Sequence, residues 1–288
     1  MRSRPGTTVA DLRAMQEMTQ RLWSLESRWH IGDLAWQRNA VPDTGSTALW
    51  EDDGNVVAWG WSELPAHLSL VVDPGRPDLA AEVLAWFEST TSARELNCMV
   101  LEPEAHLTSS LTDAGYQEDQ AAPFFTHHHR PLGELEIPAL PAGFTLRHVR
   151  PDEAVRRTAG HLAAWAEFGS NVSVAGYQSV MDAWPYRVDL DWVVEKEDGE
   201  FVATSLAWFD ERNKAGLIEP VGCAPAYRRQ GLASAVNLAA LTALREAGAT
   251  QAIVCPRGDD AYPVAAKLYQ SIGFRPGPRT ATYTKHRA

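Results

Sequence analysis

The same order of predicted strands and helices occurs twice along these 288 residues, and this repetition constrains the fold more than any other feature. In the second half, a β-hairpin around Gly199 is followed by strand, helix, strand, helix and strand over residues 216–285. The first half has a hairpin around Gly54 and the same series over residues 67–128. This alternation predicts an α/β fold in which each half has a mixed, mostly antiparallel central sheet flanked by helices.

A segment rich in proline and glycine separates the two halves. Residues 133–143 contain two prolines and two glycines, which disfavour helix and strand and predict an extended linker. We therefore predict two domains, residues 1–132 and 144–288, each of a common domain size.

The composition excludes several classes of protein. The hydrophobic content of 45% and charged content of 22% are typical of folded domains. A net charge of −11 disfavours nucleic-acid binding, which needs clustered Lys and Arg, and mildly favours a neutral or cationic small molecule. No apolar stretch is long enough to span a membrane, and the N-terminus lacks a secretory signal, so we expect a cytoplasmic protein.

The cysteines and histidines do not predict a metal site or a disulfide framework. Cys98, Cys223 and Cys255 are scattered and odd in number, so we expect each to pack as a small apolar residue. His127-His128-His129 is a run of adjacent strand residues that point to opposite faces, and we interpret it as a solvated strand end.

The segment 219–234 carries the clearest chemical signal, because it leaves a predicted strand and enters a helix. Amides at a helix N-terminus lack internal partners and favour anions, and Gly231 lets the backbone approach a pyrophosphate closely. Arg228 and Arg229 add positive charge. The segment matches neither a Gly-Lys-Ser/Thr phosphate loop nor a dinucleotide fingerprint.

The pattern R-x-x-G-x-A at 228–233 resembles the acyl-CoA-binding signature of the GNAT superfamily of N-acetyltransferases. The pattern A-x-x-L-Y-x-x-x-G-F at 265–274 is similar to the second signature of that superfamily. The tandem layout resembles the mycothiol synthase branch. The resemblance implies an acyltransferase that uses acetyl-CoA as acyl donor, without a metal.

The resemblance also implies roles for particular residues. Backbone groups of Val221 and Cys223 would pair with pantetheine, and the following amides would hold the pyrophosphate. The implied cofactor-binding set is Val221, Gly222, Cys223, Arg228, Arg229, Gln230, Gly231, Leu232, Ala233 and Ser234. Tyr262 departs from the pattern, since many family members have asparagine there.

Two side chains are candidates for the proton transfers of amide formation. Tyr269 stands at the family's usual position for the acid that protonates the leaving thiolate, and its alternative role is packing beneath the last strands. Glu219 lies where some family members place a base, and it is otherwise an ordinary strand carboxylate. Cys223 has no accompanying His and Asn and is interpreted as a small strand residue.

The front half lacks the features that carry this chemistry. Pro77 and Glu82 stand at the positions of Arg228 and Ala233, and Leu111 stands at that of Tyr269. Proline removes an amide and acidic residues repel a pyrophosphate, so we predict a degenerate copy. It would shape the acceptor pocket, support the second domain or mediate self-association as a homodimer.

The leading hypothesis is direct acetyl transfer from acetyl-CoA to a primary amine of a small molecule. One alternative is an acyl-CoA-binding sensor or scaffold without catalysis, and another is acetylation of protein lysines or N-termini. The acceptor and the use of longer acyl groups stay open.

Overall fold

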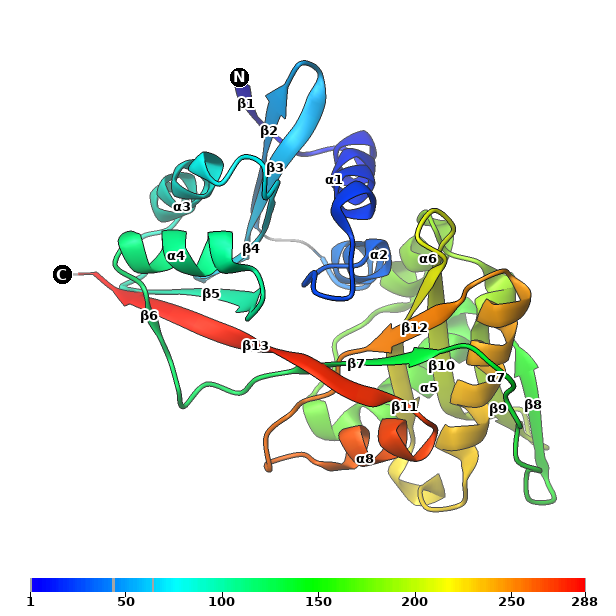
Figure 1. Cartoon of the computed structure of the whole chain (residues 1–288). Coiled ribbons are helices and arrows are strands. Elements are labelled where there is room, and N and C mark those ends of the chain that lie inside the picture. Colours follow the sequence, from blue (N-terminus) through cyan, green and yellow to red (C-terminus); the bar gives the residue numbers. More distant parts are fainter. Residues whose placement is uncertain (1, 43–44, 64, 288) are drawn as a thin grey trace.

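The structure is a computed structural model that describes residues 2–42, 45–63 and 65–287. In these residues, 13 strands form one sheet that runs through both halves of the chain (Figure 1). The order along the sheet is β1 (Arg2–Pro5), β2 (Ser46–Asp52), β3 (Asn55–Glu63), β4 (His67–Val72), β5 (Glu95–Leu101), β13 (Arg275–His286), β7 (Thr126–Pro131), β12 (Gln251–Val254), β11 (Ala215–Cys223), β10 (Phe201–Asp210), β9 (Asp191–Lys196) and β8 (Phe144–His148), while β6 (Gln117–Glu118) pairs with β13.

The front half has helices on both faces of its strands. The β2–β3 hairpin turns at Asp53 and Gly54, which have φ angles of 46° and 79° as a tight two-residue hairpin turn requires. Helices α3 (Asp78–Thr90) and α4 (Ala105–Asp113) pack on one face, and α1 (Val9–Leu22) packs on the other (Figure 1). The predicted mixed sheet flanked by helices is confirmed here.

The C-terminal half repeats this arrangement. Its β9–β10 hairpin turns at Gly199, with φ of 91°. One face carries α7 (Leu232–Glu246) and α8 (Val264–Ser271), and the other carries α5 (Ala154–Ala164) and α6 (Val174–Asp182). Three short 3-10 turns complete the half: η1 (Ala166–Phe168), η2 (Val188–Leu190) and η3 (Pro225–Tyr227).

The two halves exchange their last strands. β7 comes from the first half of the chain but pairs with β12, whereas residues 280–286 of β13 pair with β5 of the front half. The order of elements expected from the sequence does not reveal this exchange. The alternation of side chains along a strand shows which face is buried but not which sheet edge the strand joins.

This exchange bears on the predicted domains. Dividing the chain at 132 and 144 would separate β7 from β12, with which it pairs, and β13 from β5, with which it pairs. The division into 1–132, 133–143 and 144–288 stays a prediction from sequence.

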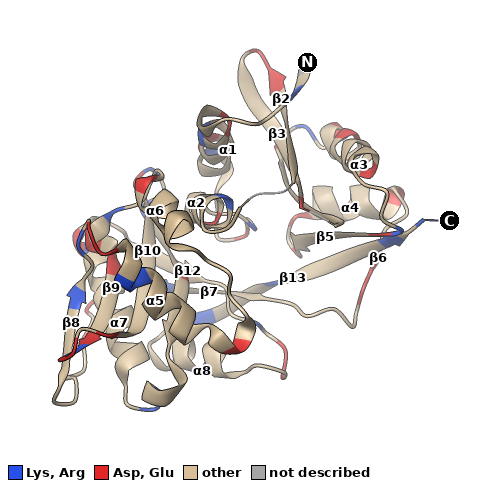
Figure 2. Ribbon diagram, turned by 180° about the vertical axis from the view of Figure 1, so that it is seen from behind, with Lys and Arg blue, Asp and Glu red and all other residues tan. Residues whose placement is uncertain are grey.

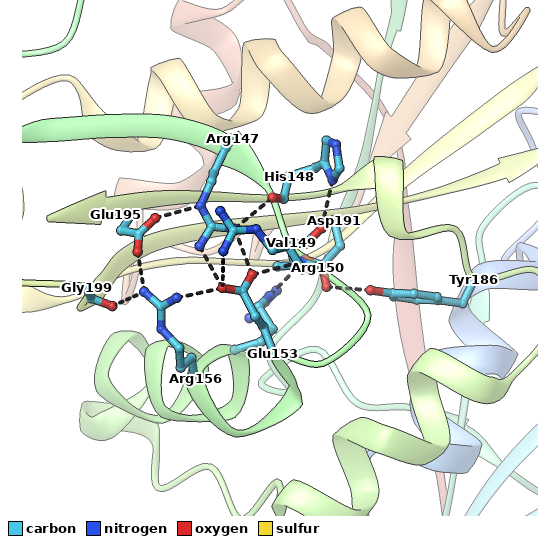
Figure 3. A network of polar contacts seen from close by, with 11 residues as sticks. Arg147, His148, Val149, Arg150, Glu153, Arg156, Tyr186, Asp191, Glu195 and Gly199 are labelled. Atoms are coloured by element: carbon cyan, nitrogen blue, oxygen red, sulfur yellow. Dashed lines mark hydrogen bonds and ion pairs between the residues drawn. The ribbon is translucent and has the colours of Figure 1, made fainter. Parts of the chain in front are cut away.

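An ion-pair network fixes α5 to the outer strands (Figure 3). Glu153, just before α5, accepts hydrogen bonds from Arg147 at 2.7 Å and from Arg156 at 2.6 Å. Arg147 also donates to Glu195 on β9 at 2.6 Å. The Arg147 hydrogen bond is the main reason that the pKa of Glu153 falls to about 2. We assign this network to structure, since it lies on the outer strands.

The arginines of β8 and α5 lie beside acidic residues of β9 rather than forming a basic stripe of their own (Figure 2). Among the residues that the structure describes, no helix has the length and apolar character that crossing a membrane requires.

Candidate active site

Strands β11 and β12 separate from one another partway along their length. They pair in parallel only over Ala215–Leu217 and Gln251–Ile253, although β11 continues to Cys223 along β10. A bulge interrupts the β10 pairing near residues 219–220. The last part of β11 therefore has no described strand partner on its β12 side, and an edge of this kind can pair with an extended ligand.

The hydrogen-bond alternation along β11 determines which of its groups face this opening. The Ala224 amide donates to the Val202 carbonyl of β10 at 2.9 Å. Because orientations alternate in an antiparallel pair, Gly222 faces β10, whereas Val221 and Cys223 turn their backbone groups to the open side. These are the two residues for which the resemblance implied pairing with pantetheine.

The opening leads to the N-terminus of α7. Gly231 is the N-cap of this helix, with φ of 80°, and no side chain caps the first amides. A side chain at Gly231 would meet nothing within 4 Å, so the space in front of these amides is open. Arg229 also has a left-handed backbone, with φ of 63°. The geometry suits an anion, and the helix begins at Leu232, directly after Gly231 ends the loop.

The remaining predicted residues of the cradle surround this helix start. Arg229 and Gln230 are exposed, Ala233 and Ser234 are half-buried, and Leu232 is buried in the core beneath the loop. Arg228 bonds the Cys223 carbonyl through Nε at 3.2 Å and pairs with Glu167 of η1 at 2.6 Å. The predicted set is thus brought together around one loop.

Tyr269 lies on α8, beneath the opening. Its ring packs edge-on against Phe274 at a centroid distance of 5.9 Å, and its side chain belongs to the hydrophobic core. Its hydroxyl makes no hydrogen bond within the described residues. Burial raises the pKa of Tyr269, and negative charge on Glu219 and Cys255 adds to the effect. Tyr269 therefore both packs as a core residue and lies within electrostatic reach of the two strands that separate.

Glu219 lies at the bulge of β11 and is half-buried. Its backbone carbonyl accepts a hydrogen bond from the Trp208 indole at 2.7 Å. Its carboxyl group makes hydrogen-bonding contact with Asp33 of the front half. Burial, followed by the nearby Asp33 charge, holds the pKa of Glu219 well above its ordinary value.

Asp33 and Arg28 are residues of this region that our sequence reasoning missed. Asp33 is in the first turn of α2 (Ile31–Asn39) and accepts a hydrogen bond from the His30 amide at 2.7 Å. The Arg28 guanidinium stacks on the ring of Trp29 at 4.8 Å. Both precede the repeated strands and lie outside both sequence motifs, so no local signal points to them.

Helix α2 lies against the C-terminal half rather than the front sheet alone. Its Ala35 and Trp36 share a hydrophobic cluster with residues of α6, β10, β11 and β12. A Cβ atom at Gly32 would lie 2.3 Å from Cγ of Trp208, so only glycine allows this approach. This packing brings Asp33 to Glu219.

A row of aromatic rings borders the open end of β11. Trp36 contacts His161 at 5.4 Å, His161 stacks on Trp165 at 5.8 Å, and Phe168 meets Tyr262 at 5.0 Å. Trp165 and Phe168 are also in contact, at 5.5 Å. Tyr262, which replaces the family's asparagine, therefore contributes to an aromatic wall.

Gly222 allows the aromatic row to approach β11. A Cβ atom at this position would lie 2.6 Å from the Ala164 side chain and 3.0 Å from Nε1 of Trp165.

The cysteines and histidines match the sequence interpretation only in part. Burial raises the pKa of the Cys223 and Cys255 thiols, as expected for packed, unreactive cysteines. His127 and His128 are buried, at 3% and 2% exposure, so the predicted solvated strand end is wrong. The reason is that β7 lies inside the joined sheet. In the described ranges, no group of three or more His, Cys, Asp or Glu is placed to hold a metal ion.

The comparisons with known proteins agree with this geometry. Residues 159–274 match the model of the acetyltransferase (GNAT) family. No curated protein sequence matches the chain.

Several solved structures share the fold over almost the whole chain. A tandem GNAT protein from the clavulanic acid biosynthesis pathway is 17% identical, with a TM-score of 0.66, and the match covers 99% of this chain and 98% of that one. A GCN5-related N-acetyltransferase from Sphaerobacter thermophilus is 16% identical, with a TM-score of 0.65 and coverage of 99% and 95%. A GNAT-family acetyltransferase from Colwellia psychrerythraea is 12% identical, with a TM-score of 0.63 and full coverage of both chains.

At such low identity, the structural matches establish the fold alone, while the family match covers the segment that contains the open strand edge, the α7 loop and Tyr269. Residues 159–274 in the C-terminal half thus match the acetyltransferase (GNAT) family, and the whole chain shares its fold with a tandem GNAT protein.

Proposed function

We propose that the chain is an N-acetyltransferase that moves an acetyl group directly from acetyl-CoA to a primary amine of a small molecule. The observation that carries this proposal is the open edge of β11, which ends at the uncapped, glycine-led N-terminus of α7. An extended thioester arm with a pyrophosphate at one end has the chemistry that such an edge and helix start would bind.

The residues present fit the donor. Val221 and Cys223 offer backbone groups on the open side, and the amides from Arg229 to Ser234 offer donors to the pyrophosphate. Arg228 would add a positive charge after exchanging its contact with Glu167 for the ligand. The thioester would then lie near Cys223, between the carboxyl ends of β11 and β12.

Tyr269 and Glu219 would handle the protons. The amine nitrogen attacks the thioester carbon, the carbon–sulfur bond breaks, and Tyr269 gives its phenolic proton to the departing thiolate. The Glu219 carboxylate, beside Asp33, takes up the proton released by the amine and passes it to solvent before the next cycle. The cycle closes when Tyr269 recovers a proton from solvent.

Direct transfer is favoured over an enzyme-bound acyl intermediate. Cys223 is the thiol nearest to the proposed thioester, but burial raises its pKa, and within the described residues its thiol makes a polar contact only with the Ala224 carbonyl oxygen. A thiol that stays protonated is a poor nucleophile.

The placement of α2 supports a small acceptor rather than a folded protein. The front half covers the face of β11 that carries Glu219, through Gly32, Asp33 and Trp36. Under the alternative of protein acetylation, a lysine side chain would have to reach beneath this helix.

Calorimetric titration of acetyl-CoA tests the proposal. The wild-type protein should bind one acetyl-CoA per chain, and a double variant with Arg228→Ala and Gly231→Asp should lose that binding. Arg150→Ala is the matched control, because this arginine is 66% exposed and lies away from the loop. No binding to the wild type would contradict the proposal, and two sites would show that the front half also binds cofactor.

Release of free CoA, followed with a thiol reagent across a panel of primary amines, then tests transfer. A sensor without catalysis would bind acetyl-CoA but release no CoA with any amine.

A further inference from the structure

Next to the proposed acyl-transfer site is a cationic side chain that forms no ion pair with a carboxylate in the part of the chain that the structure describes. Arg28 belongs to the segment that joins α1 to α2, and its Nε is buried without a hydrogen-bond partner. Among the described residues, no carboxylate lies within ion-pairing distance of its guanidinium. A partly buried guanidinium without a counter-ion is costly to maintain, which suggests that its partner is a ligand.

The guanidinium of Arg28 is held in place. It stacks on Trp29, and the backbone amide of Arg28 donates to Glu104 at 3.2 Å. The Glu104 carboxyl also accepts the Leu101 amide at 2.8 Å, and burial raises the pKa of Glu104. Glu104 thus anchors the main chain here, and its carboxyl is an electrostatic neighbour of the guanidinium without forming an ion pair with it in the described residues.

Arg28 and Asp33 act electrostatically on the same two groups, one of which is the proposed catalytic carboxyl of Glu219. Its positive charge lowers the pKa of Glu219 and of Cys255, and both of these groups also respond to Asp33. Cys255 directly follows β12, at the end of the opening where the thioester would lie. One cation and two carboxyls, supplied by both halves, therefore surround this end of the opening.

The arrangement complements a molecule that carries both charges. A carboxyl pair can receive an ammonium group, and an arginine fork pairs with a carboxylate through two parallel hydrogen bonds. Resting on the function proposed above, we infer that the front half completes the acceptor site and that the acceptor is a small amino acid, with Arg28 binding its carboxylate and Asp33 and Glu219 receiving its amine.

Matched pairs of amines test this inference on the full-length protein. The probes are glycine, β-alanine and 4-aminobutanoate, each compared with its carboxamide, which keeps the amine but removes the negative charge. For at least one pair, the wild type should show a kcat/KM for the acid that is about tenfold or more above that for the amide. Arg28→Met should abolish this preference and leave acetyl-CoA affinity unchanged within about twofold.

Two further variants keep the result interpretable even if Arg28→Met does not fold. Arg28→Lys keeps the charge but loses the fork, so it should fold even if Arg28→Met does not, and it should retain only part of the preference. Asp33→Asn should lower kcat/KM for acids and amides alike and should change the pH profile, because it acts on the amine. Arg150→Met is the control that should leave both substrates unaffected.

Three results would overturn the inference: a wild type that prefers the amides, an Arg28→Met variant that slows acids and amides equally, or a preference that survives in this variant. If acetyl-CoA binds but no amine turns over, the proposed function fails. Calorimetry of the same amines in the presence of CoA then tests the inference separately. The acids should still bind more tightly than their amides, and binding of neither would refute the inference.

Discussion

Helices α3 and α7 begin at corresponding places in the two halves, yet only one of these starts suits a phosphate. α7 follows Gly231 in a left-handed conformation and has no acidic residue in its first turn. α3 follows Pro77, and its first residue, Asp78, pairs with Arg76 at 2.9 Å. Both helices carry the same dipole, so the dipole alone does not make an anion site. The turn that leads into the helix and the charge of its first turn decide whether an anion fits.

The strand edges behind these helices show the same contrast. β4 and β5 pair in parallel only at His67 and Leu68, so the front half also has strands that separate. There, however, His106 of α4 bonds the Val72 carbonyl at 3.1 Å, and Leu111 fills the core where the C-terminal half has Tyr269. The front half keeps the framework of the fold but not the groups that would use it.

The largest expected effect concerns the Tyr269 and Leu111 positions. Tyr269→Phe removes only the hydroxyl, so kcat should fall about 100-fold to 1,000-fold, as for loss of a general acid, while acetyl-CoA affinity stays the same. Leu111→Met, in the front half, should leave both unchanged. Unaltered turnover in Tyr269→Phe would leave this tyrosine with a packing role only.

The next effect concerns the two glycines that precede the helices. Gly231→Ala forces a side chain into a left-handed conformation and into the space in front of α7, so acetyl-CoA affinity should fall about tenfold or more in calorimetry. Gly75→Ala is the matched change, because Gly75 lacks a positive φ. Equal losses in both variants would mean that the front loop also holds cofactor.

The contact between the halves should respond to Gly32→Ala. The added methyl group would collide with Trp208, which should lower the free energy of unfolding by about 1 to 3 kcal/mol and move Asp33 away from Glu219. Chemical denaturation together with kcat measures both effects. Gly133→Ala is the control, since nothing lies within 4 Å of the added atom. A stable Gly32→Ala variant with full activity would show that the packing of α2 on Trp208 does not position the site.

The smallest expected effect is on the pH dependence of stability. Because the pKa of Glu219 is raised in the folded state, the folded protein keeps this proton to higher pH than the unfolded chain does, so this residue favours folding least at high pH. Its contribution should decline as pH rises above about 4.5 towards the raised pKa. Asp33, Arg28, Cys255 and Tyr269 are the titratable neighbours in this cluster.

Melting temperatures between pH 5 and pH 9 give the measurement. Glu219→Gln should be stabilised relative to the wild type at pH 9 more than at pH 5, because glutamine stays neutral at both values. Glu82→Gln, at an exposed position, should show no such trend. A parallel shift of both curves would exclude a buried, protonated Glu219.

The sequence by itself determined the order of elements and predicted where a donor site would lie. Short-range features suffice for these: hydrophobic periodicity, the hairpin glycines, and the run from Arg228 to Ala233 that leads from a strand into a helix. Tyr269 and Glu219 were predicted because each lies at a set distance from such a motif. Local spacing governs local structure, so these predictions did not depend on how the halves meet.

Only the tertiary structure decided which strands complete which sheet and what surrounds Glu219. The exchange of β7 and β13 joins residues about 150 positions apart, as in the pairing of Thr126 with Arg279, and strand alternation is the same on either sheet edge. Asp33 reaches Glu219 because α2 packs on Trp208, a contact that depends on complementary shape rather than on any pattern along the chain. Burial then sets the protonation of Glu219, because the cost of a buried charge depends on every group packed around it.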